Sequence, residues 1–185
     1  MTVLALGGSD CEALRDGLLG QPINTLSSLA YVAAGAYVLR RGGPAAPAWA
    51  LGAVGVGSVL YHGPMPPGAE AIHDGAIVAL AAACAVAWRR RSFVRPPTLA
   101  LVALAAGGAV NVLTRTGAAL CRPDSALQGH AAWHALTALG VAVWLGSRQL
   151  SGPAAAPGPE VPPRRSRQVS NASGDGQAHT RLRSP

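Results

Sequence analysis

Five long apolar runs constrain this chain of 185 residues more than any other feature. They are Ile23–Leu39, Ala45–His62, Ile72–Trp88, Pro97–Leu113 and Ala126–Leu145. Each is about 17–20 residues long and carries almost no charged side chain. An α-helix rises about 1.5 Å per residue, so each run can cross the roughly 30 Å hydrocarbon core of a bilayer. We therefore predict an all-α fold, an integral membrane helical bundle with about five transmembrane helices.

The composition argues against several other classes of protein. Charged residues make up 12% of the chain, about half of the fraction in an ordinary soluble domain. All fifteen cations are arginine, and they lie between and after the apolar runs instead of along one polar face. This pattern does not fit a disordered chain, a coiled coil or a soluble nucleic-acid binder. A soluble bundle of buried helices is the remaining alternative, and five successive apolar runs of this length argue against it.

Three segments follow from this pattern. Residues 1–22 form an N-terminal segment, which we expect to face outward, and residues 23–148 form the bundle. Residues 149–185 are rich in Pro, Gly, Ala, Ser and Arg and hold almost no large apolar side chain. Such a segment cannot bury enough apolar surface to offset the entropy lost on ordering, so we predict a disordered cytoplasmic tail.

The arginines predict the orientation of the bundle. An odd number of spans places the two chain ends on opposite sides of the membrane. One side carries arginines almost without acids: Arg40, Arg41, Arg89, Arg90, Arg91, Arg95 and Arg148. The other side mixes Arg15, Arg115 and Arg122 with Asp10, Glu12, Asp16, Glu70, Asp74 and Asp124. By the positive-inside rule the arginine-rich side is cytoplasmic, so the N-terminus faces outward.

The same topology sorts the three cysteines. Cys11 and Cys121 fall on the outward, oxidising side, while Cys84 lies within the third run. A disulfide between Cys11 and Cys121 is therefore one prediction. Two unpaired thiols are the alternative, and only the distance between the residues decides between them.

Ionisable and polar residues gather at the outward ends of three runs. His62 closes the second run, His73 and Asp74 open the third, and His130 and His134 lie at the start of the fifth. Such groups are costly inside a membrane and are functional candidates by default. The topology therefore brings side chains far apart in sequence to one membrane depth.

Three of the histidines match the ligand set of a catalytic metal. His130 and His134 are four residues apart, so they share one helix face and can hold one ion together. His62 adds a third imidazole at the same depth. Three neutral imidazoles with an open fourth position are typical of a catalytic zinc site. Haem ligation is an alternative, although the close spacing of His130 and His134 favours one small ion.

The other polar residues near this depth have simpler interpretations as well. Ser58 lies one turn before His62 on the same face, but a serine can also bond to a carbonyl of its own helix. Asp74 is either a catalytic acid or a helix N-cap. His73 points about 100° away from Asp74 on an ideal helix, so we do not expect both of them to face the site, and we interpret His73 as a lining or interfacial residue.

These motifs resemble those of the alkaline ceramidases and the wider CREST superfamily of membrane hydrolases. The resemblance rests on Gly57-Ser58-Val59-Leu60-Tyr61-His62, on Asp74, and on Gln128-Gly129-His130-Ala131-Ala132-Trp133-His134. Asp10-Cys11-Glu12 and Asn24-Thr25 are similar to the N-terminal signature of that family. The similarity covers roughly residues 9–148, with gaps.

The resemblance implies zinc on His62, His130 and His134, with Ser58 and Asp74 beside it, and it implies the same Cys11–Cys121 disulfide. Two features depart from the family. Seven spans are usual there, and this chain has room for five. Eukaryotic members also hold calcium near the N-terminal signature, but Ser9 and Gln21 stand here where carboxylates are expected, which argues against calcium.

The leading functional hypothesis is a zinc-dependent hydrolase that cleaves the amide bond of ceramide or a related N-acyl lipid within the bilayer. Asp74 would act as general base and then acid, and the Ser58 hydroxyl would stabilise the oxyanion. The alternative is a non-catalytic membrane protein that uses the metal for a structural or receptor-like role, as in the related adiponectin receptors.

Overall fold

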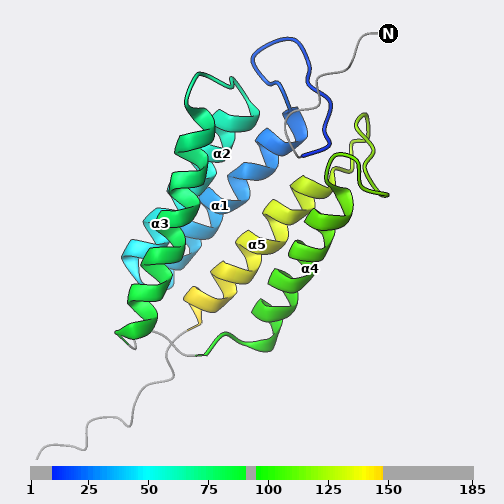
Figure 1. Ribbon diagram of the computed structural model, residues 1–185. Coiled ribbons are helices and arrows are strands. Elements are labelled where there is room, and N and C mark those ends of the chain that lie inside the picture. The colour runs from blue at the N-terminus through cyan, green and yellow to red at the C-terminus, as the bar shows by residue number, and fades with distance from the viewer. Residues whose placement is uncertain (1–9, 91–94, 148–185) are drawn as a thin grey trace, which may run out of the picture. The chain divides into compact units, whose positions relative to one another are not determined.

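The computed structural model describes residues 10–90 and 95–147, and this part of the chain is all-helical. It forms α1 (Pro22–Arg40), α2 (Ala45–His62), α3 (Ala69–Arg89), α4 (Thr98–Thr114) and α5 (Gly129–Gly146) (Figure 1). The prediction of an all-α fold is confirmed, and every predicted apolar run overlaps one helix. Residues 148–185, which include the predicted tail, lie outside the described residues, as do residues 1–9.

Local sequence sets where the helices begin and end. Pro22 occupies the first turn of α1, where its missing N–H costs nothing. The turn after α1 contains Gly42 at φ 71°, a left-handed conformation that glycine adopts freely. Gly68 plays the corresponding role before α3, at φ 86°. Since α3 begins at Ala69, Asp74 lies in its second turn, and the N-cap interpretation of Asp74 is wrong.

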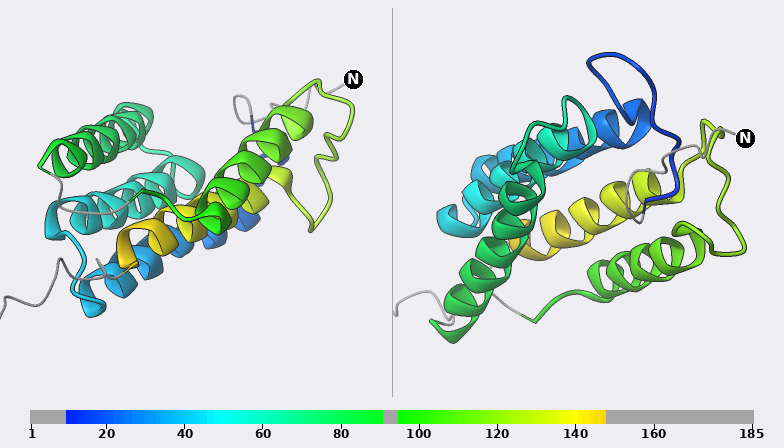
Figure 2. Two further views of the ribbon diagram at one scale, coloured as in Figure 1. Left: turned by 90° about the horizontal axis from the view of Figure 1, so that it is seen from below. Right: turned by 45° about the horizontal axis from the view of Figure 1, so that its top comes forward.

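The helices pack side by side in an order that differs from their order along the chain. α1 lies between α2 and α5, α3 packs on α2, and α4 packs on α5. Among the described helices, α3 and α4 therefore each have one main neighbour, and Figure 2 shows them far apart at opposite ends of this arrangement. The starts of α1, α3 and α5 and the end of α2 meet at one end of the bundle, which we call the histidine end.

Glycines allow close contact between α1 and α2 and between α4 and α5. A Cβ atom on Gly35 of α1 would stand 2.5 Å from the carbonyl oxygen of Ala48 in α2. A Cβ atom on Gly140 of α5 would stand 3.0 Å from the carbonyl oxygen of Ala100 in α4. Small residues at such crossings let helix backbones approach one another.

The distribution of side chains differs from that in a water-soluble bundle, because many polar residues are buried and many large apolar ones are exposed. Buried positions include charged and polar residues, among them Glu12, Gln21, Asn24, Ser28, Ser58, His62 and His134. Large apolar side chains are exposed on all five helices, including Leu26, Trp49, Val78, Val102 and Leu139. The buried apolar cluster is small and lies around Tyr31, Val38, Leu51, Val54 and Leu145.

By length and composition, one of the described helices, α3, can cross a membrane on its own. The helix α4 is apolar but only 17 residues long. α1, α2 and α5 are long enough, but their hydroxyl, amide and imidazole side chains lower the mean hydropathy. The polar residues that fill the interior are thus the ones that weaken the membrane signal of these three helices.

We predict that Gly35→Ala destabilises the bundle and Gly52→Ala does not. The added methyl group at position 35 meets backbone atoms of α2, which cannot move aside, whereas the one at position 52 meets nothing within 4 Å. We expect a loss of about 1–3 kcal/mol for Gly35→Ala, as for other overpacked sites. Thermal unfolding followed by circular dichroism measures the difference, and equal stability of the two variants would contradict it.

Candidate metal centre

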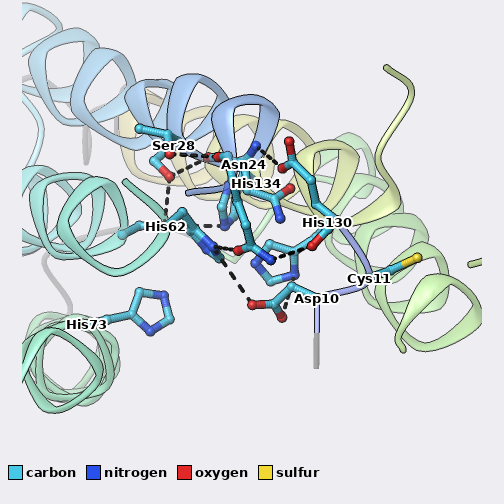
Figure 3. Close-up of polar contacts among 12 residues, drawn as sticks. Asp10, Cys11, Asn24, Ser28, His62, His73, His130 and His134 are labelled. Carbon is cyan, nitrogen blue, oxygen red and sulfur yellow. Dashed lines mark hydrogen bonds and ion pairs between the residues drawn. The ribbon is translucent and has the colours of Figure 1, made fainter. Parts of the chain in front are cut away.

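Three histidines from two helices meet at the histidine end. His62 ends α2, and His130 and His134 occupy the first two turns of α5. The ring centroids are 5.0 Å apart for His62 and His130, 5.4 Å for His62 and His134, and 4.5 Å for His130 and His134. His62 and His134 are fully buried, and the side chain of His130 is 11% exposed. Figure 3 shows the three rings between the ribbons of α1, α2 and α5.

A glutamine fixes the proton of the His62 ring. Gln21 donates a hydrogen bond from its side-chain nitrogen to the carbonyl oxygen of Glu12 at 2.9 Å. Its side-chain oxygen consequently faces His62 Nδ1, at 2.6 Å. Because that oxygen can only accept, Nδ1 carries the proton and Nε2 keeps a bare lone pair.

The other two rings are held in the same tautomer. His130 Nδ1 lies 3.3 Å from the Asp10 carboxylate and 3.3 Å from the side-chain oxygen of Asn111, and both are acceptors. His134 Nδ1 lies 2.8 Å from the Ser27 hydroxyl, which donates its own proton to the carbonyl oxygen of Asn24. Both Nδ1 atoms therefore donate, and each Nε2 is left bare.

The three Nε2 atoms have the properties of a metal-ligand set. Those of His62 and His130 are buried without a hydrogen-bond partner. The ligand atoms of the three residues lie within 4.8 Å of one another, and no other described group of three such residues has this geometry. Bare lone pairs buried together are unfavourable unless something shares them. A metal ion supplies that partner, and the hydrogen bonds to Nδ1 are the kind that hold ligating imidazoles in place.

The N-terminal segment reaches the site through Glu12 and a disulfide. The buried Glu12 carboxylate accepts the backbone N–H groups of Ile23 and Asn24, the first free donors of α1, at 2.9 and 2.8 Å. Cys11 is joined to Cys121, which confirms the predicted disulfide. These two anchors directly follow Asp10, which is 5% exposed, and keep its carboxylate beside the imidazoles.

Ser58 lies next to the three histidines. Its hydroxyl oxygen is 3.4 Å from His134 Nε2 and 2.8 Å from the hydroxyl of Ser28. Ser28 donates its proton to the carbonyl oxygen of Asn24 at 2.7 Å, so Ser58 donates to Ser28. The lone pairs of Ser58 therefore face the ring of His134.

The structure places His73 nearer to the site than Asp74. His73 stacks on Tyr61 at 5.1 Å between ring centroids, and its ring centroid is 6.2 Å from that of His62 (Figure 3). A Cβ atom on Gly57 would stand 3.1 Å from the Cα atom of His73, so the glycine allows this approach. The Asp74 carboxylate is 66% exposed and accepts a hydrogen bond from His73 Nδ1 at 2.9 Å. No hydrogen bond or ion pair in the described part of the chain joins Asp74 to the three imidazoles.

The sequence prediction did not assign roles to Asp10, Gln21 and Ser27. Asp10 belongs to the Asp10-Cys11-Glu12 motif, which is noted only for its resemblance to a family signature. Gln21 is noted only because a carboxylate is expected at its position in that family. Ser27 lies in the first turns of α1, close to Asn24-Thr25. The sequence offers a signal for Ser27, because this residue lies among the polar residues at the start of α1, at the end of the bundle that holds His62. No comparable pattern marks Asp10 and Gln21, since their positions depend on the fold of a loop.

Comparison of the chain with protein-family models, with curated proteins and with solved structures finds no match in any of the three. The function must therefore be argued from the site itself.

We predict that Gln21→Ala weakens metal binding about 10–100-fold, the usual effect of removing a hydrogen bond to a ligating histidine. Without the glutamine oxygen, His62 Nδ1 loses its acceptor at 2.6 Å and keeps only the Asp10 carboxylate at 3.9 Å. The affinity can be measured by competition with a coloured chelator during metal titration. Asp16→Ala is the control, because Asp16 is exposed in the same segment. An unchanged affinity in Gln21→Ala would contradict the proposed role of this residue.

Proposed function

We propose that the chain is an integral membrane protein whose metal centre lies near the outer face. The main support is the distribution of side chains, with many polar groups buried and large apolar groups exposed on all five helices. Soluble proteins seldom expose extended apolar surface. A lipid environment removes this conflict, because apolar side chains then face acyl chains while the polar groups satisfy one another inside.

The charges support one orientation. In the described residues every carboxylate lies at or near the histidine end, namely Asp10, Glu12, Asp16, Glu70, Asp74 and Asp124. The opposite end carries Arg40, Arg41, Arg89, Arg90 and Arg95. The positive-inside rule puts the arginine end in the cytoplasm and the histidine end outside. The disulfide agrees with this, because Cys11–Cys121 then lies in an oxidising compartment.

We propose further that the protein is a zinc-dependent hydrolase that cleaves the amide bond of ceramide or a related N-acyl lipid. The observation that carries the proposal is the buried group of three imidazoles, in which the Nε2 atoms of His62 and His130 have no hydrogen-bond partner; three such ligands leave a fourth position open for substrate or water. Zinc bound there would supply a water of lowered pKa and would polarise a carbonyl group. The motifs shared with the alkaline ceramidases support the lipid amide as the substrate.

Asn24 supports an amide as the reacting group. Its side chain is fully buried, and neither its nitrogen nor its oxygen has a hydrogen-bond partner. In Figure 3 this residue lies beside His134. A carboxamide offers one donor group and one acceptor, which complement the carbonyl oxygen and the N–H of a substrate amide. Binding a substrate amide would relieve the cost of the two unpaired groups.

We assign the remaining steps to residues around the imidazoles. His73 accepts and returns a proton, and Asp74 holds the His73 ring by its bond to Nδ1. Asp74 thus acts through His73, which revises the direct role expected from the sequence. Ser58 donates to the oxyanion after its hydroxyl turns away from Ser28. Asp10 positions His130.

The central test combines metal content with turnover. Purified, zinc-loaded protein is incubated with lipid extracts, and released fatty acids are identified by mass spectrometry. We expect His134→Ala to lose both bound zinc and activity, and chelation of zinc from the wild type to abolish activity until zinc is restored. Full turnover by His134→Ala without metal would overturn the proposal. A zinc-loaded wild type that releases no fatty acid would favour the structural or receptor-like alternative.

A second test separates proton transfer from metal binding. We expect His73→Gln to keep its zinc and to lose about 10²–10⁴-fold in kcat, the usual contribution of general acid–base catalysis. Asp74→Asn should keep zinc and also lose turnover, by a smaller factor. Glu70→Gln is the matched control, because Glu70 lies one turn before Asp74 on α3 and is exposed. Wild-type kcat in His73→Gln would exclude the assigned role.

A further inference from the structure

Two apolar grooves lie at the end of the bundle opposite the histidines. The first has a volume of about 460 Å³ and lies between α3 and α5, lined mainly by Ala81, Cys84, Ala85, Trp88 and Trp144. The second has a volume of about 440 Å³ and lies on the other side of α3, against the residues that begin α2, Pro44–Pro47. Both volumes are within the range that holds lipid-sized or drug-sized ligands. The last turns of α3 therefore stand between two apolar surfaces.

An arginine lines each groove. Arg89 borders the first groove and Arg90 the second, and both are exposed. No ion pair in the described part of the chain joins either guanidinium to a carboxylate, and the described acids all lie towards the other end of the bundle. A ligand for this place therefore combines apolar chains with a negative headgroup, to which a guanidinium can donate two hydrogen bonds.

The aromatic residues agree with a ligand at a membrane surface. The rings of Trp88 and Trp144 approach each other across the first groove, with centroids 6.2 Å apart. Trp side chains are enriched at the level of lipid headgroups, where one part of the ring meets acyl chains and the other meets water. Trp88 and Trp144 lie near the last residues of α3 and α5. In Figure 1 these helix ends lie opposite the histidine end of the bundle.

We propose that this end of α3 is a binding site for an anionic phospholipid of the cytoplasmic leaflet. The acyl chains lie in the two grooves on either side of α3, and the headgroup phosphate binds Arg89 and Arg90. The site is separate from the metal centre and independent of the hydrolase activity, but it rests on the proposed membrane location. Its chemistry requires a negative headgroup, so a zwitterionic lipid of the same chain length is a poor ligand.

Quenching of tryptophan fluorescence by brominated lipids tests the proposal. The Trp49→Phe, Trp133→Phe double variant serves as the parent, because these two tryptophans line neither groove and would report general contact with lipid. It is reconstituted in phosphatidylcholine vesicles that contain a small fraction of brominated phosphatidylglycerol or brominated phosphatidylcholine. We expect an apparent enrichment of phosphatidylglycerol around Trp88 and Trp144 of about thirtyfold, the factor that corresponds to about 2 kcal/mol from two arginines.

Two double variants show whether the enrichment depends on the grooves. Arg89→Gln with Arg90→Gln should reduce the quenching by brominated phosphatidylglycerol to that by brominated phosphatidylcholine. Arg40→Gln with Arg41→Gln removes the same charge from the same end without touching residues that line either groove, and should keep the enrichment. Equal quenching of the parent by the two brominated lipids would by itself overturn the proposed site, before either double variant is measured. An equal loss in both double variants would overturn it as well, since it would show attraction to the whole charged surface. Hydrolase activity is measured separately in the same vesicles, so failure of one proposal is distinguished from failure of the other.

Discussion

The hydrogen bonds to the Nδ1 atoms of His62, His130 and His134 are the interactions on which the rest of the site depends. A buried imidazole has two nitrogens to satisfy, and the partner of one decides what the other can do. Gln21, Asp10 and Ser27 accept from the three Nδ1 atoms, so each Nε2 has its lone pair turned inward. Gln21 and Ser27 each donate a hydrogen bond to a backbone carbonyl oxygen, which leaves an oxygen to accept from the histidine, and the carboxylate of Asp10 accepts because it is charged. The chain thus builds a ligand set and not only a cluster of histidines.

Two of these supporting residues, Asp10 and Gln21, come from the N-terminal segment that precedes α1, which explains why the anchors at Cys11 and Glu12 matter. The 110-residue separation of Cys11 and Cys121 makes the disulfide a long-range constraint, and closing so long a loop removes considerable entropy from the unfolded chain. Glu12 adds a local constraint by accepting the first N–H groups of α1. Loss of either anchor would release Asp10 and Gln21 before it disturbed the helices, so metal affinity is the sensitive property.

The sequence predicts the helices and the ligands better than it predicts their supports. The bounds of α2 match the predicted run, because Pro44 and Gly63 mark its ends. The three candidate ligands can be predicted from the topology, since helix ends on the same side of a membrane must lie at a similar depth in it. Asp10 and Gln21 lack such an argument, because the loop that carries them has no periodicity and its path depends on a disulfide whose alternatives the sequence leaves open. His73 and Asp74 show a different limit of the sequence prediction. Their separation of about 100° on the helix argues against both side chains facing the site, but it does not say which one does. The close approach of α3 to α2 at Gly57 places His73 nearer to the site.

The packing also separates the candidate metal ligands from the His73–Asp74 pair that we assign to proton transfer. All three ligands and the supporting groups Asp10, Gln21 and Ser27 lie on α1, α2, α5 and the N-terminal segment, and Asn111 of α4 adds one contact. α3 supplies only the His73–Asp74 pair and has α2 as its one main neighbour among the described helices. A bundle of five helices, shorter than the seven of the family it resembles, can therefore keep a complete ligand set. What the shorter chain leaves open is the side between α3 and α5, and lipid must cover that side if the protein lies in a membrane. If the protein is the proposed hydrolase, the bilayer would then form part of the surroundings of its substrate, and lipid composition would affect its activity.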